Sequence, residues 1–501
     1  MRMSLTELDG AAFDTVIIGG GINGASAAQH LTAAGYRVML VEKGDFASGS
    51  TSRSTRILHC GLRYFETPSP LWDFALAPSK LRTALRMARQ SMEMRGELAQ
   101  DSPARLRRFT MLFPIHEGGA YRGWQVDLAF HLLGRYGPKD VPLNYDRRSA
   151  AHLQDLPFVA QMRDVERLTS VATFTEYLYD WPERICLDAV LDAQRMGATV
   201  RNYTEAISLQ HSDTWTVTLG DATGTARVSA PTVLNMAGIW IDCVNTAANQ
   251  SKRLIYGTKG AHVAVKLPEA FRDYGIATVN SVGEPHYCVP SQGGLHHIGP
   301  TETPYGGDPD DVRVDAADRS FLLNETRLAL PGLSLTDDDI VYSWAGVRPL
   351  GFDPAFPKGK RSTDIHDLGR GMFALTGGPI MTHRAAGRAL RDKVAEVIRP
   401  SQPAQSLDYA PRHPPENPNS PPFDDRLRQS DLVHAATEEQ AQNLTDILFA
   451  RTGAVYHAQL SDEDLRRAAQ AVSAHLGWDA SRIEAEVHAT RNRMGHLFDL
   501  Y

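Results

Sequence analysis

A glycine-rich turn between a predicted strand and a predicted helix constrains the fold of this chain more than any other feature. The β-branched residues Thr15–Ile18 predict a buried strand, and the turn GGGING at residues 19–24 follows directly. A helical pattern then continues to Gly35, and residues 37–41 predict a second strand. This order of strand, tight turn, helix and strand is typical of an α/β domain that binds a dinucleotide.

Each position in the turn has a physical role. Gly19 permits the tight turn, Gly21 lets a pyrophosphate approach the backbone, and Gly24 lets the helix pack on the strand. Ile22 and Asn23 begin the helix, whose free N–H groups and positive dipole end attract phosphate. A glycine-rich turn in an unrelated α/β domain is the alternative, but the flanking strand and helix favour a dinucleotide site.

An acid and a hydroxyl-rich loop follow the second predicted strand. Glu42 ends that strand, where it can accept hydrogen bonds from a ribose hydroxyl. Residues 48–56 are dense in small and hydroxyl side chains that can line a pyrophosphate and a flavin. Composition alone leaves FAD and NAD both open, because any solvated loop has this composition. The candidate cofactor ligands here are Glu42, Lys43, Ser50, Thr51, Ser52 and Ser54.

Residues 48–66, SGSTSRSTRILHCGLRYFE, resemble a motif of the FAD-dependent glycerol-3-phosphate dehydrogenases and oxidases. The family pattern is close to S-S-x-x-S-[KR]-L-[IV]-H-G-G-L-R-Y-L-E, with Cys60 here in place of the first glycine of H-G-G. Five later segments also resemble the family, so the resemblance covers nearly the whole chain. These segments are LNMAGIW (234–240), KGAHV with HIGPTETPY (259–263 and 297–305), YSWAGVRPL (342–350) and FALTGGPIMTHR (373–384).

The resemblance implies non-covalently bound FAD and oxidation of the secondary alcohol of glycerol 3-phosphate or a related polyol phosphate or small anionic alcohol. The hydride would pass to flavin N5, with quinone or oxygen as the electron acceptor. His59 and His262 are candidate bases, since imidazole titrates near neutral pH, and Arg348 is a candidate anion clamp. Structural roles for these histidines and arginines remain the alternative. Further candidates are Arg63, Tyr64 and His383 for the substrate, and Gly238, Gly378, Pro379, Ile380, Met381 and Thr382 for the cofactor.

Two departures from the family pattern bear on the substrate. Where the family has the lysine of G-G-K-L-T-T-Y-R, this chain has Pro379, and His383 replaces the tyrosine. A lysine there can reach the substrate's oxygens in the family, whereas proline cannot. Two other hypotheses therefore stay open: an FAD-dependent amine or amino-acid oxidase, and a flavoprotein that has lost catalysis and binds a partner or a membrane.

Composition and charge restrict the class of protein further. The 501-residue chain has a formal net charge of −7, which gives no case for nucleic acid as a partner. Its four cysteines are scattered without metal-ligand spacing, so we expect no metal and buried free thiols in a reducing compartment. No segment is typical of a signal peptide or a transmembrane helix, which predicts a cytoplasmic protein. The basic and aromatic region from Lys80 to Tyr136 suggests peripheral contact with the inner face of the cell membrane, and a homodimer stays open.

The sequence predicts an α/β fold: a Rossmann-like FAD-binding domain, a mixed-sheet substrate domain and a C-terminal helical domain. Residues 1–400 form the oxidoreductase region. Its FAD-binding segments are about 13–75, 184–245 and 342–398, interleaved with substrate-domain segments at about 76–183 and 246–341. A proline-rich linker at 401–425 leads to helices in 426–501, one of them capped by Ser461 and ended by Gly477.

Overall fold

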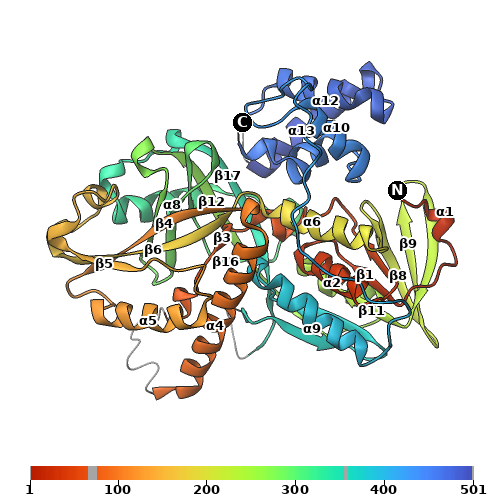
Figure 1. The fold of residues 1–501 in the computed structure, drawn as a ribbon, viewed down its shortest axis with the longest axis horizontal. Coiled ribbons are helices and arrows are strands. Elements are labelled where there is room, and N and C mark those ends of the chain that lie inside the picture. The colour runs from red at the N-terminus through yellow and green to blue at the C-terminus, as the bar shows by residue number, and fades with distance from the viewer. Residues whose placement is uncertain (1, 66–75, 355–358, 458, 499–501) are drawn as a thin grey trace.

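The computed structural model describes residues 2–65, 76–354, 359–457 and 459–498 (Figure 1). The glycine turn follows β1, an inner strand of a six-stranded sheet whose strands run in the order β18-β19-β11-β1-β2-β7. The pairs from β19 to β7 are parallel and β18 is antiparallel, as is typical of a doubly wound domain. The strands are β1 (Thr15–Ile18), β2 (Val38–Val41), β7 (Thr199–Arg201), β11 (Thr232–Asn235), β18 (Asp364–Asp367) and β19 (Met372–Thr376).

Both faces of this sheet are covered by other elements, because its strands are apolar on both sides. Every residue of β1, β2 and β11 is buried. Helix α2 (Ile22–Ala33) packs against α6 (Pro182–Arg195) and α9 (His383–Ala395) on one face. The opposite face packs on a three-stranded antiparallel sheet. Its strands are β8 (Glu205–His211), β9 (Trp215–Asp221) and β10 (Gly224–Ala230), and the short helix α1 (Leu5–Leu8) lies beside β10.

Ten of the described strands form a mixed sheet, the predicted substrate-facing sheet (Figure 1). One boundary differs from the prediction: the segment beginning at 342 was expected in the FAD-binding region, but β17 (Ile340–Gly351) pairs along its length with β12 (Ile255–Lys266) in this sheet. The other strands are β3 (Ile57–Leu58), β4 (Leu106–His116), β5 (Asp146–Ser149), β6 (Leu168–Tyr179), β13 (Tyr274–Val279), β14 (Pro285–Pro290), β15 (Leu295–Gly299) and β16 (Thr303–Pro304); the associated helices are α4 (Pro78–Asp101), α5 (Gly123–Tyr136) and α8 (Ala316–Ala329).

The C-terminal residues form a helical domain, as predicted. Ser461 caps α12 (Asp462–Leu476) through a reciprocal bond with Asp464, and Gly477 ends this helix at φ +67°. Before α12, the helical segment from Leu444 consists of α11 (Leu444–Asp446) and a π-helical turn, Ile447–Arg451. The remaining helices are α10 (Gln429–Glu438) and α13 (Ala480–Phe498).

The proline-rich linker packs against the FAD-binding domain. The Gln402 and Gln405 amides donate to the carbonyls of Gly35 and Ala33, where α2 ends. The Tyr409 hydroxyl lies 2.7 Å from Nε2 of His30 on α2. These contacts hold an extended segment on the surface of the domain while it leads to α10.

The cysteines are free thiols, and three of the four are buried as predicted. Cys243 is exposed, so the prediction is wrong at this position. It lies on α7 (Ile241–Ala247), a short helix with only Ile241 and Asn245 buried, so most of its side chains face outward.

Candidate active site and cofactor cradle

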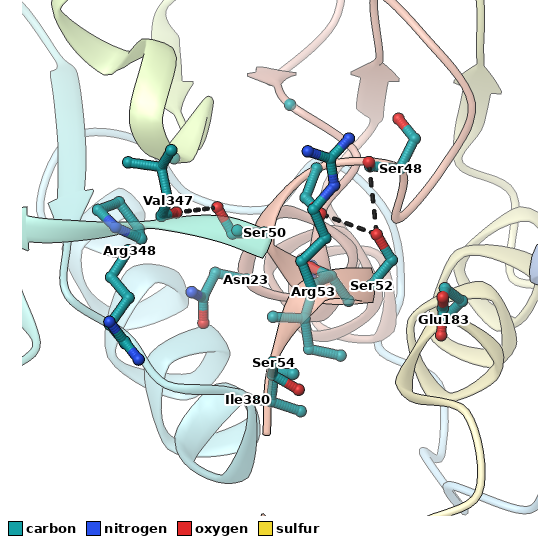
Figure 2. Close-up of a pocket in the computed structure, with 18 of the residues that line it drawn as sticks. Asn23, Ser48, Ser50, Ser52, Arg53, Ser54, Glu183, Val347, Arg348 and Ile380 are labelled. Atoms are coloured by element: carbon teal, nitrogen blue, oxygen red, sulfur yellow. Dashed lines mark hydrogen bonds between the residues drawn. The ribbon is translucent and has the colours of Figure 1, made fainter. Parts of the chain in front are cut away.

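A cavity of about 1290 Å³ runs from the glycine turn, past the hydroxyl-rich loop and β17, to α13 of the C-terminal domain. The side chains around it come from segments that are far apart in the sequence (Figure 2). Of the residues predicted for the site, all but three line this cavity. The three that do not are Gly24, Thr382 and His383.

The glycines of the turn have distinct roles. Gly19 has φ +112°, and a Cβ there would lie 2.5 Å from the Met236 carbonyl oxygen. At Gly24 a Cβ would lie 1.9 Å from the Gly19 carbonyl oxygen, so this glycine allows α2 to pack on the turn. At Gly21 the nearest atom is Thr51 Oγ1 at 3.4 Å, so the protein leaves room for a side chain. Gly21 therefore leaves open the space that a ligand would need.

A second glycine turn, at residues 377–378, faces the first. Gly377 and Gly378 both have positive φ, and Asn23 Nδ2 donates to the Gly378 carbonyl at 2.8 Å. Asn23 Oδ1 is buried and has no hydrogen-bond partner within the described chain. Pro379 begins the 3₁₀ turn Ile380–Thr382 and lines the cavity. Asn23 thus connects the two turns, both of which line the cavity.

Glu42 is a partly buried acid beside the first turn. Its Oε2 accepts a hydrogen bond from the Gly20 amide at 2.7 Å, and its Oε1 accepts one from the Gly44 amide at 2.9 Å. Burial raises the pKa of this carboxyl, and the two amide bonds oppose that rise. Each oxygen retains a lone pair, so the position suits a ribose hydroxyl. Lys43 points elsewhere: its Nζ lies 2.7 Å from Asp310 Oδ2 and 4.2 Å from the Trp240 ring centroid.

The hydroxyls after Glu42 mainly hold their own loop in place. Ser50 Oγ donates to the Val347 carbonyl on β17 at 2.7 Å, and Ser52 Oγ donates to Gly49 at 2.9 Å (Figure 2). Ser54 Oγ accepts from the Arg56 amide at 3.1 Å. Thr51 Oγ1 accepts from the Ile22 amide at 3.1 Å, at the N-terminus of α2. The loop is therefore fastened to α2 and β17, and its backbone borders the cavity.

Arg348 lies at the other end of the cavity, on β17. Its guanidinium donates to the carbonyls of Thr301 and Lys259 at 3.2 and 3.4 Å, and it packs where Gly260 has no side chain. Burial lowers the pKa of Arg348 to about 10. No carboxylate of the described residues lies within ion-pair distance of it. Arg348 is thus a charged group without a direct counterion, as an anion site requires.

Two further arginines repel the positive charge of Arg348, and one of them was not predicted from the sequence. Arg63, on the 3₁₀ turn Leu62–Tyr64, and Arg361 both lower its pKa, while Glu302 raises it. Arg361 also lines the cavity and forms an ion pair with Glu302. It lies between β17 and β18 outside any recognisable motif, so no pattern in the sequence identified it.

Both candidate bases have lowered pKa values; His262 is buried and His59 is partly buried. His59 lines the cavity, and burial, aided by Arg63, lowers its pKa to about 3. His262 stacks on Trp344 with ring centroids 4.7 Å apart, and its Nε2 lies 2.9 Å from Thr55 Oγ1. Burial lowers the pKa of His262 well below its usual value. Nδ1 of each ring has no hydrogen-bond partner among the described residues.

Cys60, which departs from the family pattern, lies beside a buried acid that no sequence motif identified. The Cys60 amide donates to Glu176 Oε1 at 2.9 Å, and Arg95 Nε lies 3.7 Å from Glu176 Oε2. Burial raises the pKa of Glu176 to about 7, although Arg95 opposes the rise. Glu176 lines the cavity from β6.

His383 and Thr382 were predicted in the site, but the structure places them outside the cavity. His383 is buried at the start of α9, where Nδ1–H donates to the Ile380 carbonyl at 2.7 Å. Thr382 Oγ1 donates to the Pro379 carbonyl at 3.0 Å. These two side chains stabilise the backbone that follows the second turn, on the side away from the cavity. The substrate-binding role predicted for His383 is therefore wrong.

The fold and the cavity define an α/β protein whose glycine turn suits a dinucleotide. A family model described as FAD dependent oxidoreductase matches residues 14–393. The chain belongs to this family of FAD-dependent oxidoreductases.

Known proteins of similar sequence or structure point to a narrower group. A glycerol-3-phosphate dehydrogenase of Synechocystis sp. is 28% identical over 425 residues, covering 79% of this chain and 72% of that protein. The FAD complex of a Bacillus halodurans glycerol-3-phosphate dehydrogenase superposes with TM-score 0.72 and 19% identity, covering 98% and 96% of the two chains. The Mycoplasma pneumoniae L-α-glycerophosphate oxidase superposes with TM-score 0.59 and 16% identity, covering 80% and 98%.

The cradle fits FAD on structural grounds. Gly21 leaves space beside the N-terminus of α2, and Glu42 offers a partly buried acid at the predicted ribose position. The second turn is fastened to β17, since the Gly377 amide donates to the Pro349 carbonyl at 2.9 Å. When bound, FAD supplies the acceptor for a hydride from the substrate. Among the described helices, none combines the length and the apolar character needed to cross a membrane.

Proposed function

We propose that this enzyme oxidises the secondary alcohol of glycerol 3-phosphate or of a related polyol phosphate. The observation that carries the proposal is the set of three arginines, Arg63, Arg348 and Arg361, gathered at one end of the cavity beside two neutral histidines. A phosphate dianion suits such a site, because guanidinium forks bind its oxygens bidentately.

Arg348 would hold the phosphate, with His59 or His262 accepting the hydroxyl proton. In the free protein Arg63 is the charged group that lowers the pKa of His59. A dianion bound between the arginines would offset their field and raise the basicity of the imidazole when the substrate is present. Proton acceptance would thus be coupled to phosphate binding.

The loss of the family lysine at Pro379 does not remove the second cation from the site. Arg361 lines the same cavity and acts electrostatically on Arg348. Its pairing with Glu302 holds it in place but reduces its net attraction for an anion. This arrangement supports a polyol phosphate substrate despite the departure at Pro379.

The test is anaerobic bleaching of the flavin absorbance by a panel of substrates. We expect glycerol 3-phosphate or another polyol phosphate to reduce the flavin, and unphosphorylated glycerol to be at least about a hundredfold slower, since the arginine contacts are lost. Reduction by glycine or another amine alone would favour the amino-acid oxidase hypothesis. Reduction by no member of the panel would favour a binding protein. The rates at which a soluble quinone and oxygen reoxidise the reduced flavin would then be compared, and the faster one would identify the electron acceptor.

We further propose a cytoplasmic enzyme that associates peripherally with the inner face of the cell membrane through α4 and α5. Trp124 and Leu128 on α5 are 54% and 52% exposed, and three exposed cations lie on neighbouring α4. These cations are Lys80, Arg82 and Arg86. Co-sedimentation with anionic vesicles should weaken with salt, since the screening length is about 8 Å at physiological ionic strength. A Trp124→Ala/Leu128→Ala variant that co-sediments like the wild type would contradict the proposal.

A further inference from the structure

Two arginines outside the predicted site meet where the C-terminal domain closes over the cavity. Arg53 ends the 3₁₀ turn Ser50–Arg53, and Arg493 lies on α13; both line the cavity. Figure 2 shows the Arg53 side chain directed away from Arg348, so the two belong to separate parts of the cavity. The backbone of Arg53 is held in place against β17, because a Cβ at Gly346 would lie 2.5 Å from the Arg53 Cβ.

Neither arginine has a counterion within the described residues. No hydrogen bond or ion pair of either guanidinium occurs there, and Arg53 Nε is buried without a partner. The carboxylate that acts on both is Asp310, and it already pairs with Lys43 at 2.7 Å. Two half-buried guanidinium groups near one another, without an anion, are unfavourable because each is desolvated and repels the other.

The surrounding polar groups are already engaged. The Tyr203 hydroxyl donates to Asp446 at 2.6 Å, and the Tyr456 hydroxyl donates to Glu183. Burial lowers the pKa of Arg53 to about 10, and Arg493 is the charged group that lowers it most. The protein therefore holds the positive charges of Arg53 and Arg493 at this part of the cavity without a paired carboxylate among the described residues.

We propose that Arg53 and Arg493 form a binding subsite for a phosphoryl group, built jointly by the FAD-binding domain and the C-terminal domain. Two guanidinium forks match the charge and oxygen geometry of a phosphate or diphosphate. Either the diphosphate of FAD or a separate phosphate occupies it. The subsite is distinct from the substrate position at Arg348 and does not depend on which alcohol the enzyme oxidises.

The first experiment measures FAD release from the holoenzyme. After dilution, the recovery of flavin fluorescence gives the release rate for wild type, Arg53→Gln and Arg493→Gln. If the subsite holds the FAD diphosphate, each substitution should accelerate release at least about tenfold. Arg482→Gln is the matched control: Arg482 lies on the same helix and lines the same cavity, but it pairs with Glu486 at 2.6 Å. It should change the rate less than about twofold.

The second experiment tests for a separate phosphate. Inorganic phosphate is titrated into FAD-saturated holoenzyme at constant ionic strength, and the thermal midpoint is followed. A separate phosphate should raise the midpoint in the wild type and in Arg482→Gln, but not in Arg53→Gln or Arg493→Gln, while chloride should have no such effect.

A third measurement needs no variant, which covers the case in which a substitution prevents folding. Phenylglyoxal modification of the wild type, mapped by mass spectrometry, should show Arg53 and Arg493 protected by FAD or by phosphate, and Arg482 unprotected. The proposal is overturned if both arginines react equally with and without these ligands and neither FAD release nor the phosphate response changes in the variants. It is also overturned if Arg482→Gln matches their effects.

Discussion

One end of the cavity is lined by the glycine turn, a continuous stretch at residues 19–24, whereas the part around Arg348 is lined by side chains from distant segments. The turn depends on three glycines that lie within six residues of one another and lack Cβ atoms: Gly19, Gly21 and Gly24. Arg63, Arg348 and Arg361 come from a 3₁₀ turn, from β17 and from the connection after β17. Backbone recognition needs a local conformation, whereas side-chain recognition needs a completed fold.

The largest effect should follow from a side chain at Gly24. A Cβ there would meet the Gly19 carbonyl at 1.9 Å, so Gly24→Val should separate α2 from the turn, destabilise the protein by about 3 kcal/mol and abolish FAD retention. Gly21→Leu is the contrasting variant, since its Cβ is accommodated and only the ligand space is filled. We expect colourless protein from both, but a near-normal urea midpoint for the apoprotein only from Gly21→Leu. Full flavin occupancy in Gly21→Leu would refute the assigned cradle.

At the side-chain end, Arg348→Ala should reduce kcat/KM for the polyol phosphate by roughly thirty- to a thousandfold, because a charge-assisted bidentate contact in a dry site contributes about 2–4 kcal/mol. Flavin content should not change. Arg361→Ala should reduce kcat/KM by roughly fivefold or less, since Arg361 is 40% exposed and already paired. Steady-state kinetics on the purified variants measure both effects. Equal losses from the two substitutions would contradict the assignment of Arg348 as the principal clamp.

A variant of His383 tests whether this residue binds substrate or only stabilises the fold beside the cavity. Burial lowers its pKa to about 3, so below about pH 6.5 the unfolded chain binds a proton that the folded chain does not. Its contribution to stability is complete above about pH 6.5 and falls by about 1.4 kcal/mol for each pH unit below that value. His383→Asn, whose amide can still donate to Ile380, should flatten the pH dependence of urea unfolding between pH 6.5 and 5. The variant should leave KM within about twofold. A large rise in KM would show instead that His383 contributes to substrate binding.

The smallest effect should come from Pro379→Lys. Pro379 has φ −60° and ψ 153°, which any residue adopts, so the change should cost at most about 1 kcal/mol of stability. Because Arg361 already supplies a second cation, kcat/KM should move by about threefold or less. Steady-state kinetics with glycerol 3-phosphate and with a second polyol phosphate measure this change in kcat/KM. A gain of a hundredfold for glycerol 3-phosphate alone would show that Arg361 does not replace the family lysine.

The sequence by itself determined the parts that depend on local spacing. The glycine turn, Glu42, the caps of α12 and the strands beside them follow from residues only a few positions apart, and the structure contains them where predicted. Arg348 and His59 were found because they stand in contiguous motifs that resemble a family. Each of these predictions needed only near neighbours along the chain.

Only the tertiary structure decided which distant side chains share the cavity. It joined β17 to the substrate sheet, removed His383 from the site, and added Arg361, Glu176, Arg53 and Arg493. Arg53 and Arg493 are 440 positions apart and meet because α13 packs beside β17. Long-range packing, burial and the absence of a counterion determine the role of such residues, and no local pattern in the sequence carries that information.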